Sequence, residues 1–132
     1  RLSGPLLDRI DLRVTLERPT MADLEFDTTP ESSTIVAQRV MQARERAAHR
    51  YADRMWLMNS HVPGPVLRRH YPPDESGQDL LRHHIAGLSA RGADRVLRTA
   101  WTIADLEGHD RPTAMDVANA MRFREGAGAW AA

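Results

Sequence analysis

The hydrophobic positions of this chain follow two different periods. Residues 10–16 alternate apolar and polar side chains without interruption, a pattern that predicts a half-buried β-strand. No other segment offers a matching strand, and a lone strand is unstable in water. We therefore expect residues 10–16 to pair with a sheet outside this chain or to fray. Residues 17–32 carry acidic residues, threonines and two prolines, which is typical of a linker.

From about Ser33 onward the apolar residues recur every three or four positions, which predicts a helix. We expect this helix to extend to about Leu57 or Asn59, with Ser32 or Ser33 capping its first turn. Its inward face comprises Val36, Val40, Ala43, Ala47, Tyr51 and Met55. The opposite face, expected to be solvated, carries Arg39, Arg46, Arg50 and Asp53. Residues 60–77 are rich in proline and glycine, so we expect a loop there, with room for one helical turn around Val66–His70.

Three shorter helices are predicted in the second half of the chain. They cover residues 78–86, residues 90–107 and residues 113 to about 124. Residues suited to start or end these helices flank them: Ser89, Gly108, Thr113 and Asp116. The middle helix is expected to bury Ala93, Val96, Leu97, Ala100, Ile103 and Ala104.

These patterns predict a mainly α fold, a small helical bundle preceded by a short strand segment. We expect a lead-in over residues 1–32, a helical domain over residues 33–124 and a flexible tail over residues 125–132. The first residue is Arg1 rather than methionine, so we expect the chain to be a piece of a longer protein. The strand segment would then belong to the missing part.

Composition narrows the function classes. The chain has 18 basic and 18 acidic residues, and this balance argues against a dedicated nucleic-acid binder. Residues 32–70 nevertheless hold seven arginines against two acids, which indicates either a solvated basic face or a contact for an anionic partner. Cysteine is absent, which fits a cytoplasmic protein and excludes cysteine-ligated metal sites. No apolar run is long enough to span a membrane, and the scattered histidines predict no metal site.

The stretch Ser-Gly-Pro-Leu-Leu-Asp-Arg-Ile-Asp-Leu, residues 3–12, holds the first candidate site residue. Arg9 directly precedes the predicted strand, where its guanidinium can reach a phosphate across a subunit boundary. The alternative is a surface ion pair between Arg9 and Asp8 or Asp11.

The second candidate is a stripe of three arginines at helical spacing, Arg91, Arg95 and Arg98. Arg91 follows the predicted Ser89 cap, where helix N–H groups and a guanidinium can face phosphate oxygens together. The same stripe also fits a solvated surface with Asp94 and Asp105 nearby. A helix-turn-helix that reads a DNA groove is a further option, although residues 74–132 sum to a net charge of −2.

Residues 6–12, Leu-Leu-Asp-Arg-Ile-Asp-Leu, resemble the signature of magnesium chelatase-type AAA+ ATPases. Residues 40–46 and 88–108 resemble the long helix and the C-terminal lid of the magnesium chelatase-like AAA+ family of the ComM/YifB type. The resemblance extends over nearly the whole chain, to about Arg124. It implies that residues 1–32 are the end of the AAA+ core and that residues 33–124 are an AAA+ lid with a long inserted helix.

The resemblance also implies roles for the candidate residues. Arg9 matches the arginine finger that reaches a neighbouring subunit's ATP, Arg91 matches the second-sensor arginine, and Arg95 is a possible accessory. ATP and Mg²⁺ would be held by an α/β core outside this chain, in a ring homo-oligomer, expected to be a hexamer. The complete protein would couple ATP hydrolysis to DNA remodelling in recombination or competence.

The chain by itself is not expected to be an enzyme or to bind a cofactor. A P-loop requires a lysine, and the sequence contains none. Two other functions stay open: the motor subunit of a metal chelatase, which uses the same parts, and a free-standing helix-turn-helix DNA-binding module.

Overall fold

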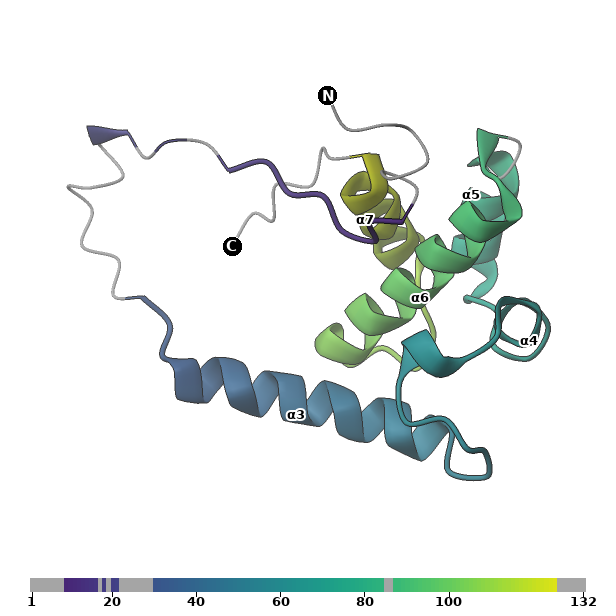
Figure 1. Ribbon diagram of the computed structural model, residues 1–132, viewed down its shortest axis with the longest axis horizontal. Helices are drawn as coiled ribbons and strands as arrows, with labels where there is room; N and C mark the ends of the chain where they lie inside the picture. The colour runs from purple at the N-terminus through teal and green to yellow at the C-terminus, as the bar shows by residue number, and fades with distance from the viewer. Residues whose placement is uncertain (1–8, 17, 19, 22–29, 85–86, 126–132) are drawn as a thin grey trace.

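The computed structural model describes residues 9–16, 18, 20–21, 30–84 and 87–125, and this part of the chain is a small helical bundle (Figure 1). The predicted mainly α fold is confirmed. Its elements are α3 (Ser33–Arg50), the 3₁₀-helix η1 (Asn59–His61), α4 (Gly64–His70), α5 (Glu75–His84), α6 (Ala90–Glu107) and α7 (Ala114–Glu125).

Helix α6 is the centre of the bundle. It packs against α3, η1, α4 and α7, and α5 completes the bundle by packing against α7. All six side chains that the sequence places on the inward face of α6 are buried, and Trp101 joins them. Burying one large apolar side chain contributes about 1.5–3 kcal/mol. The apolar face of α6 therefore decides how the other helices assemble.

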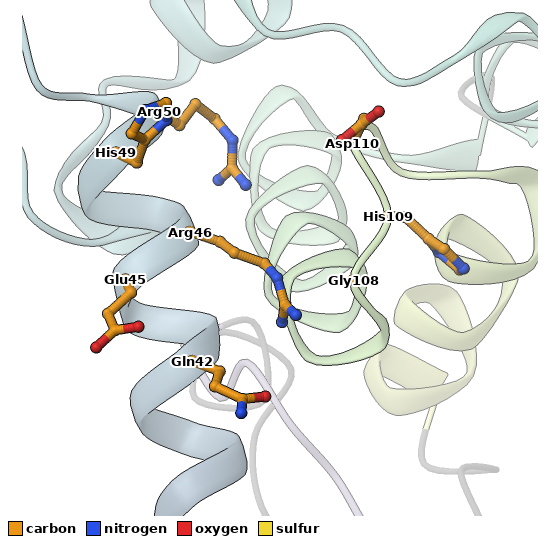
Figure 2. A pocket seen from close by; sticks show the side chains of 8 residues that line it. All are labelled: Gln42, Glu45, Arg46, His49, Arg50, Gly108, His109 and Asp110. Atoms are coloured by element: carbon orange, nitrogen blue, oxygen red, sulfur yellow. The ribbon is translucent and has the colours of Figure 1, made fainter.

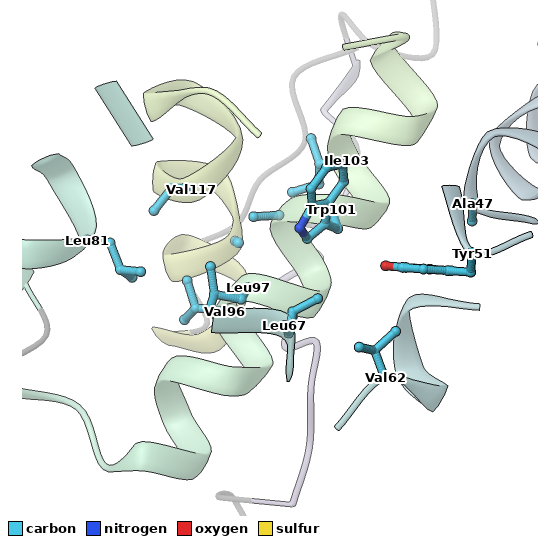
Figure 3. Close-up of a cluster of buried hydrophobic side chains, with 12 residues drawn as sticks. Ala47, Tyr51, Val62, Leu67, Leu81, Val96, Leu97, Trp101, Ile103 and Val117 are labelled. Atoms are coloured by element: carbon cyan, nitrogen blue, oxygen red, sulfur yellow. The ribbon is translucent and has the colours of Figure 1, made fainter. Parts of the chain in front are cut away.

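The core gathers apolar side chains from every helix of the bundle (Figure 3). Val62 and Leu67 come from the middle of the chain and are fully buried beside α6. Tyr51 is 1% exposed and contacts Tyr71 edge to face, with ring centroids 5.1 Å apart. Trp56 packs on Tyr51 in the same way, at 6.1 Å. Residues between α3 and α5 thus form part of the core rather than a surface loop.

The helix ends follow the predicted capping chemistry. Ser32 Oγ accepts a hydrogen bond from the Ile35 N–H at 3.3 Å at the start of α3. Gly108 ends α6 with φ of 80°, a left-handed conformation in which glycine has no steric penalty. At the start of α7, Thr113 and Asp116 each accept a hydrogen bond from the other's backbone N–H. This reciprocal pair is the capping box that the sequence predicts.

Helix α3 is shorter than predicted, because it ends at Arg50 rather than near residues 57–59. Tyr51 enters the core, and the chain then turns so that Trp56 can pack back on its ring. Met55, predicted to face inward, is consequently 97% exposed. Val36 and Val40 are also exposed, because the first half of α3 extends beyond the bundle (Figure 1). Of the predicted inward face, Ala43, Ala47 and Tyr51 are buried.

The region predicted as a loop contains η1, α4 and the first turn of α5. Helix α5 begins at Glu75, three residues before the predicted start, because Asp74 caps it. Asp74 Oδ1 accepts hydrogen bonds from the Gly77 N–H at 2.8 Å and the Ser76 hydroxyl at 2.7 Å. At the other end of this region, α4 approaches α6 so closely that a Cβ on Gly64 would lie 1.9 Å from Asp94 Oδ2.

Residues 10–16 show no β-ladder in the described part of the chain. Most side chains of this segment are exposed, including Leu12 at 55%, Val14 at 53% and Leu16 at 88%, and only Arg13 is half-buried. The segment therefore forms no half-buried strand within this chain, in line with the expectation that it frays here or pairs with a sheet elsewhere. Two of its polar residues contact the helices, because Asp11 pairs with Arg95 and Arg13 donates to the end of α7. None of the helices in the described residues is both long and apolar enough to cross a membrane.

Candidate functional site

The first candidate, Arg9, lies exposed in a turn at the beginning of the extended segment. No ion pair joins it to another described residue. The alternative in which Asp11 pairs with Arg9 is wrong, because Asp11 Oδ1 lies 3.1 Å from Arg95 Nε instead. Asp8, the other partner considered, lies outside the described residues. The structure therefore leaves Arg9 open to solvent and connects its segment to α6.

Arg13 attaches the same segment to α7. Its backbone N–H donates to the Phe123 carbonyl at 2.8 Å, and its guanidinium donates to the Arg124 carbonyl. Carbonyl groups in the last turn of a helix lack intrahelical partners and lie at the negative end of the helix dipole. A cation at this position is stabilised by both effects.

The second candidate, Arg91, lies exposed in the first turn of α6. Ser89 Oγ caps this turn by accepting from the Gly92 N–H at 3.1 Å. Arg91 therefore lies exposed beside the N–H groups of a helix N-terminus, as the sequence predicts, and no ion pair joins it to another residue that the structure describes. This is the arrangement that binds phosphate oxygens in many proteins.

The other two arginines of the stripe are not simply solvated. Arg95 pairs with Asp11, and its side chain is 22% exposed. Arg98 donates to the Val62 carbonyl at 3.0 Å. The interpretation as a solvated stripe is therefore wrong for Arg95 and Arg98. The acids expected beside the stripe have other cations, since Asp94 pairs with Arg68.

A buried polar cluster lies between α3 and α6, and the sequence patterns do not predict it. Asp105 is 1% exposed and accepts hydrogen bonds from the Arg50 guanidinium and from Asn59 Nδ2, the latter at 2.9 Å. Asn59 Oδ1 in turn accepts from the Tyr51 hydroxyl at 2.9 Å. Arg50 also lies 3.8 Å above the Trp101 ring, in cation–π contact. These five side chains, which we call the Arg50–Asp105 cluster, connect the end of α3 to α6.

The solvated arginine face predicted for α3 is thus wrong at Arg50, whereas Arg46 is exposed as predicted but also has a protein partner. Arg50 pairs with Asp105, and Arg46 donates to the backbone carbonyl of Asp105. A signal was present in the sequence, because Asp105 directly follows Ala104 on the apolar face of α6. A carboxylate at such a position needs a cation or several donors.

Tyr51 also belongs to this cluster. Burial raises the pKa of its hydroxyl above the usual value of 10.0, and the opposite effect of the nearby Arg50 is smaller.

A groove of about 580 Å³ lies between α3 and the turn after α6 (Figure 2). Arg46 and His49 line one wall, while Gly108, His109 and Asp110 form the other. In Figure 2 the Arg46 side chain reaches across toward Gly108. Cationic and acidic side chains alternate along the groove, and Arg46 is already engaged. The groove therefore selects no single sign of ligand charge.

The geometry defines a small helical domain in which both candidate arginines are exposed, Arg9 on the lead-in segment and Arg91 at the start of the central helix. Comparison with known proteins assigns this domain to a family. Residues 30–124 match the family described as the C-terminal region of magnesium chelatase, subunit ChlI. The chain belongs to this magnesium chelatase-like family, as its C-terminal region, and the predicted resemblance is confirmed.

Three curated relatives illustrate the relationship, each matching 94–95% of the chain. An uncharacterized protein of Mycobacterium tuberculosis is 44% identical over 127 residues. The uncharacterized protein YifB of Escherichia coli is 35% identical over 127 residues, and the competence protein ComM of Haemophilus influenzae is 30% identical over 129 residues. The chain spans about a quarter of the length of these relatives, 25%, 24% and 24% respectively.

Proposed function

We propose that this chain is the C-terminal lid of an AAA+ ATPase whose subunits form a ring, expected to be hexameric, and that the ATPase remodels DNA. The observation that supports this best is the state of the arginine stripe on α6. Arg95 and Arg98 have protein partners, whereas Arg91 stands exposed beside the N–H groups of the Ser89-capped turn. A cation left free at that position is suited to a phosphate ligand.

In this proposal Arg9 is the catalytic arginine finger and acts on a neighbouring subunit's nucleotide. Phosphoryl transfer spreads negative charge over the equatorial oxygens, and a fixed guanidinium stabilises that charge. Both Arg9 and Arg91 are exposed, so each can reach a phosphate without breaking an ion pair with another described residue. ATP fits this pair of cations. It supplies the phosphoryl group, and the phosphate-binding loop and the Mg²⁺ ligands would lie in the rest of the polypeptide.

The packing of α6 supports a role as a moving unit. The Arg50–Asp105 cluster fixes the inserted helix α3 to α6, and α7 packs along the same helix. Helices held together in this way move as one rigid body when the lid rotates relative to the ATPase core. A change in contact between Arg91 and phosphate would then be transmitted to α3, about a helix length away.

The proposed substrate and cellular compartment rest on a relative of this chain rather than on contacts within it. The relative ComM is described as a competence protein, and competence concerns the handling of DNA. We extend that role to this chain and place it in the cytoplasm, where ATP is available. The arginines of residues 32–70 supply cations that could contact DNA. Two of them, Arg46 and Arg50, already donate hydrogen bonds to Asp105.

The direct test is Arg9→Ala in the complete polypeptide. We expect ATP binding to be retained and hydrolysis to fall by about 10³–10⁵-fold, the range known for arginine fingers. Steady-state turnover and nucleotide titration measure the two effects. Arg18→Ala is the matched control, because Arg18 is another exposed arginine of the lead-in. Normal turnover in the Arg9 variant would refute the finger.

A second candidate function, the motor subunit of a metal chelatase, is favoured by the family description itself. The two candidates differ in what stimulates hydrolysis. The DNA-remodelling function requires hydrolysis that responds to branched DNA, whereas a chelatase motor requires a porphyrin-binding partner subunit. The helix-turn-helix alternative is less compatible with the structure, because two of the arginines that would contact DNA are engaged, Arg95 by Asp11 and Arg98 by the Val62 carbonyl.

A further inference from the structure

The segment that carries Arg9 is bound to two helices at once. Asp11 pairs with Arg95 of α6 at 3.1 Å, and Arg13 bonds to the carbonyls of Phe123 and Arg124 at the end of α7. Residues two apart in an extended backbone lie on the same side. The side chains of Asp11 and Arg13 therefore lie on one face of the segment, and the Arg13 N–H adds a contact at its edge.

The contacts differ in strength. Asp11 is 64% exposed, so its ion pair with Arg95 is screened by solvent and contributes modestly. Arg13 is only partly exposed and places both a backbone N–H and a guanidinium on the last turn of α7. Hydrogen bonds from a charged donor to helix-terminal carbonyls are among the stronger ones. We therefore regard Arg13 as the main anchor and Asp11 as the second.

The anchors lie where the start of α6 meets the end of α7. A Cβ on Gly92 would lie 3.0 Å from Arg124 Cζ, so these two helix ends are in close contact. Arg91 and Arg95 are one turn apart on α6, about 6 Å along its axis. Arg9 precedes Asp11 by two residues, which span at most about 7 Å. Both candidate cations are thus close in sequence to one shared junction.

We propose that Asp11 and Arg13 are positioning residues that hold the Arg9 segment on the lid. Arg9 and Arg91 then keep a fixed relation to each other while the lid moves. This inference rests on the proposed function, in which both arginines approach phosphate. A finger on an unattached segment would lose conformational entropy in each cycle, and attachment removes most of that cost from the reaction. Pairing with Asp11 also offsets the charge of Arg95, whereas Arg91 has no ion pair with another described residue.

The amide of Arg13 reports directly on the attachment, because it donates to the Phe123 carbonyl. We expect it to be protected from hydrogen exchange in the chain described above. Arg13→Ala should accelerate exchange at this position by tenfold or more, and Asp11→Asn by about two- to fivefold. Asp79→Asn is the control, since it breaks another exposed ion pair, with Arg82 at 3.0 Å, on a different helix. That control should leave the exchange rate unchanged.

Charge reversal distinguishes a specific pair from a general loss of stability. Asp11→Arg and Arg95→Asp should each accelerate exchange at residue 13, and the double variant should return it to within about twofold of the original rate. Exchange at the rate of an unstructured peptide in the unmodified chain would overturn the proposal. So would unchanged exchange in both Arg13→Ala and Asp11→Asn.

Turnover in the complete polypeptide tests the positioning role itself. Asp11→Asn should lower kcat several-fold and leave the KM for ATP unchanged, because binding does not involve Asp11. The charge-reversed double variant should recover most of the lost kcat. If Arg9→Ala abolishes hydrolysis while Asp11→Asn has full kcat, the finger stands and the positioning role is refuted. If Arg9→Ala has normal turnover, the proposed function fails, and hydrogen exchange still decides whether the attachment exists.

Discussion

Asp105 is the most buried acidic residue in the described part of the molecule, at 1% exposed. Its charge is compensated by Arg50, which is itself 13% exposed, and by the Asn59 amide. Replacing a well-bonded buried pair with apolar residues is often tolerated, but removing one partner leaves an unpaired charge. The cluster is therefore sensitive to single substitutions.

We expect Asp105→Ala to lower the free energy of unfolding by about 3 kcal/mol, because Arg50 loses its partner in largely buried surroundings. Urea denaturation near neutral pH measures this change. The control is Asp79→Ala, whose pair with Arg82 is mostly exposed and should change stability by about 0.5 kcal/mol or less. A loss of less than about 1 kcal/mol for Asp105→Ala would show that the cluster is dispensable.

Asp74 gives the bundle a pH dependence. Hydrogen bonds from the Gly77 N–H and the Ser76 hydroxyl lower the pKa of its carboxyl below the usual 3.8. A lowered pKa in the folded state stabilises the fold above the unfolded pKa, and this stabilisation disappears as pH falls through the folded value. Asp74→Asn should thus lower stability at pH 7 by about 0.3–1 kcal/mol and make little difference near pH 2. Urea denaturation at both pH values checks this, and an equal difference at both would contradict it.

At the scale of elements, the contact between α4 and α6 depends on the absence of a side chain. A Cβ on Gly64 would lie 1.9 Å from Asp94 Oδ2, and Asp94 is also the partner of Arg68. Gly64→Ala should displace Asp94 and lower the free energy of unfolding by about 1–3 kcal/mol. Thermal denaturation measures the effect. The double variant Gly64→Ala, Asp94→Ala removes the clash and should be more stable than Gly64→Ala alone; otherwise the close approach is not the cause.

Local signals predicted most of the helices. The prediction of α6 over residues 90–107 is correct because its periodicity, its N-cap Ser89 and its stop residue Gly108 are all contained in one short stretch. The early end of α3 at Arg50 was missed, because it depends on Tyr51 packing against Trp56 and Tyr71. Such contacts between separate elements leave no trace in a periodic pattern.

The candidate site divides in the same way. The exposed Arg91 behind its cap followed from sequence alone, since a cap and a spacing are local features. The pair of Asp11 with Arg95 joins opposite parts of the chain, and so does the pair of Arg50 with Asp105, 55 residues apart. The sequence contains 18 acidic residues, so charge alone does not predict which of them pairs with a given arginine. The roles of Arg9 and Arg91 toward nucleotide remain predictions.

At the scale of the molecule, α6 organises both stability and the proposed function. Its apolar face holds the core, its start carries Arg91, and its last turn carries Asp105. A displacement at the first turn therefore reaches α3 through a single helix. Since the chain spans about a quarter of its relatives, the lid would be a small lever attached to a much larger protein.

The outward row formed by Leu12, Val14 and Leu16 has a practical consequence for handling the chain. An extended segment that presents exposed aliphatic groups is a template for edge-to-edge association in concentrated samples. Substituting lysine at Leu12 and Leu16 would discourage such aggregates. It would also leave the contacts of Asp11 and Arg13 with the helices unchanged, so a less aggregation-prone variant keeps the attachment of the segment.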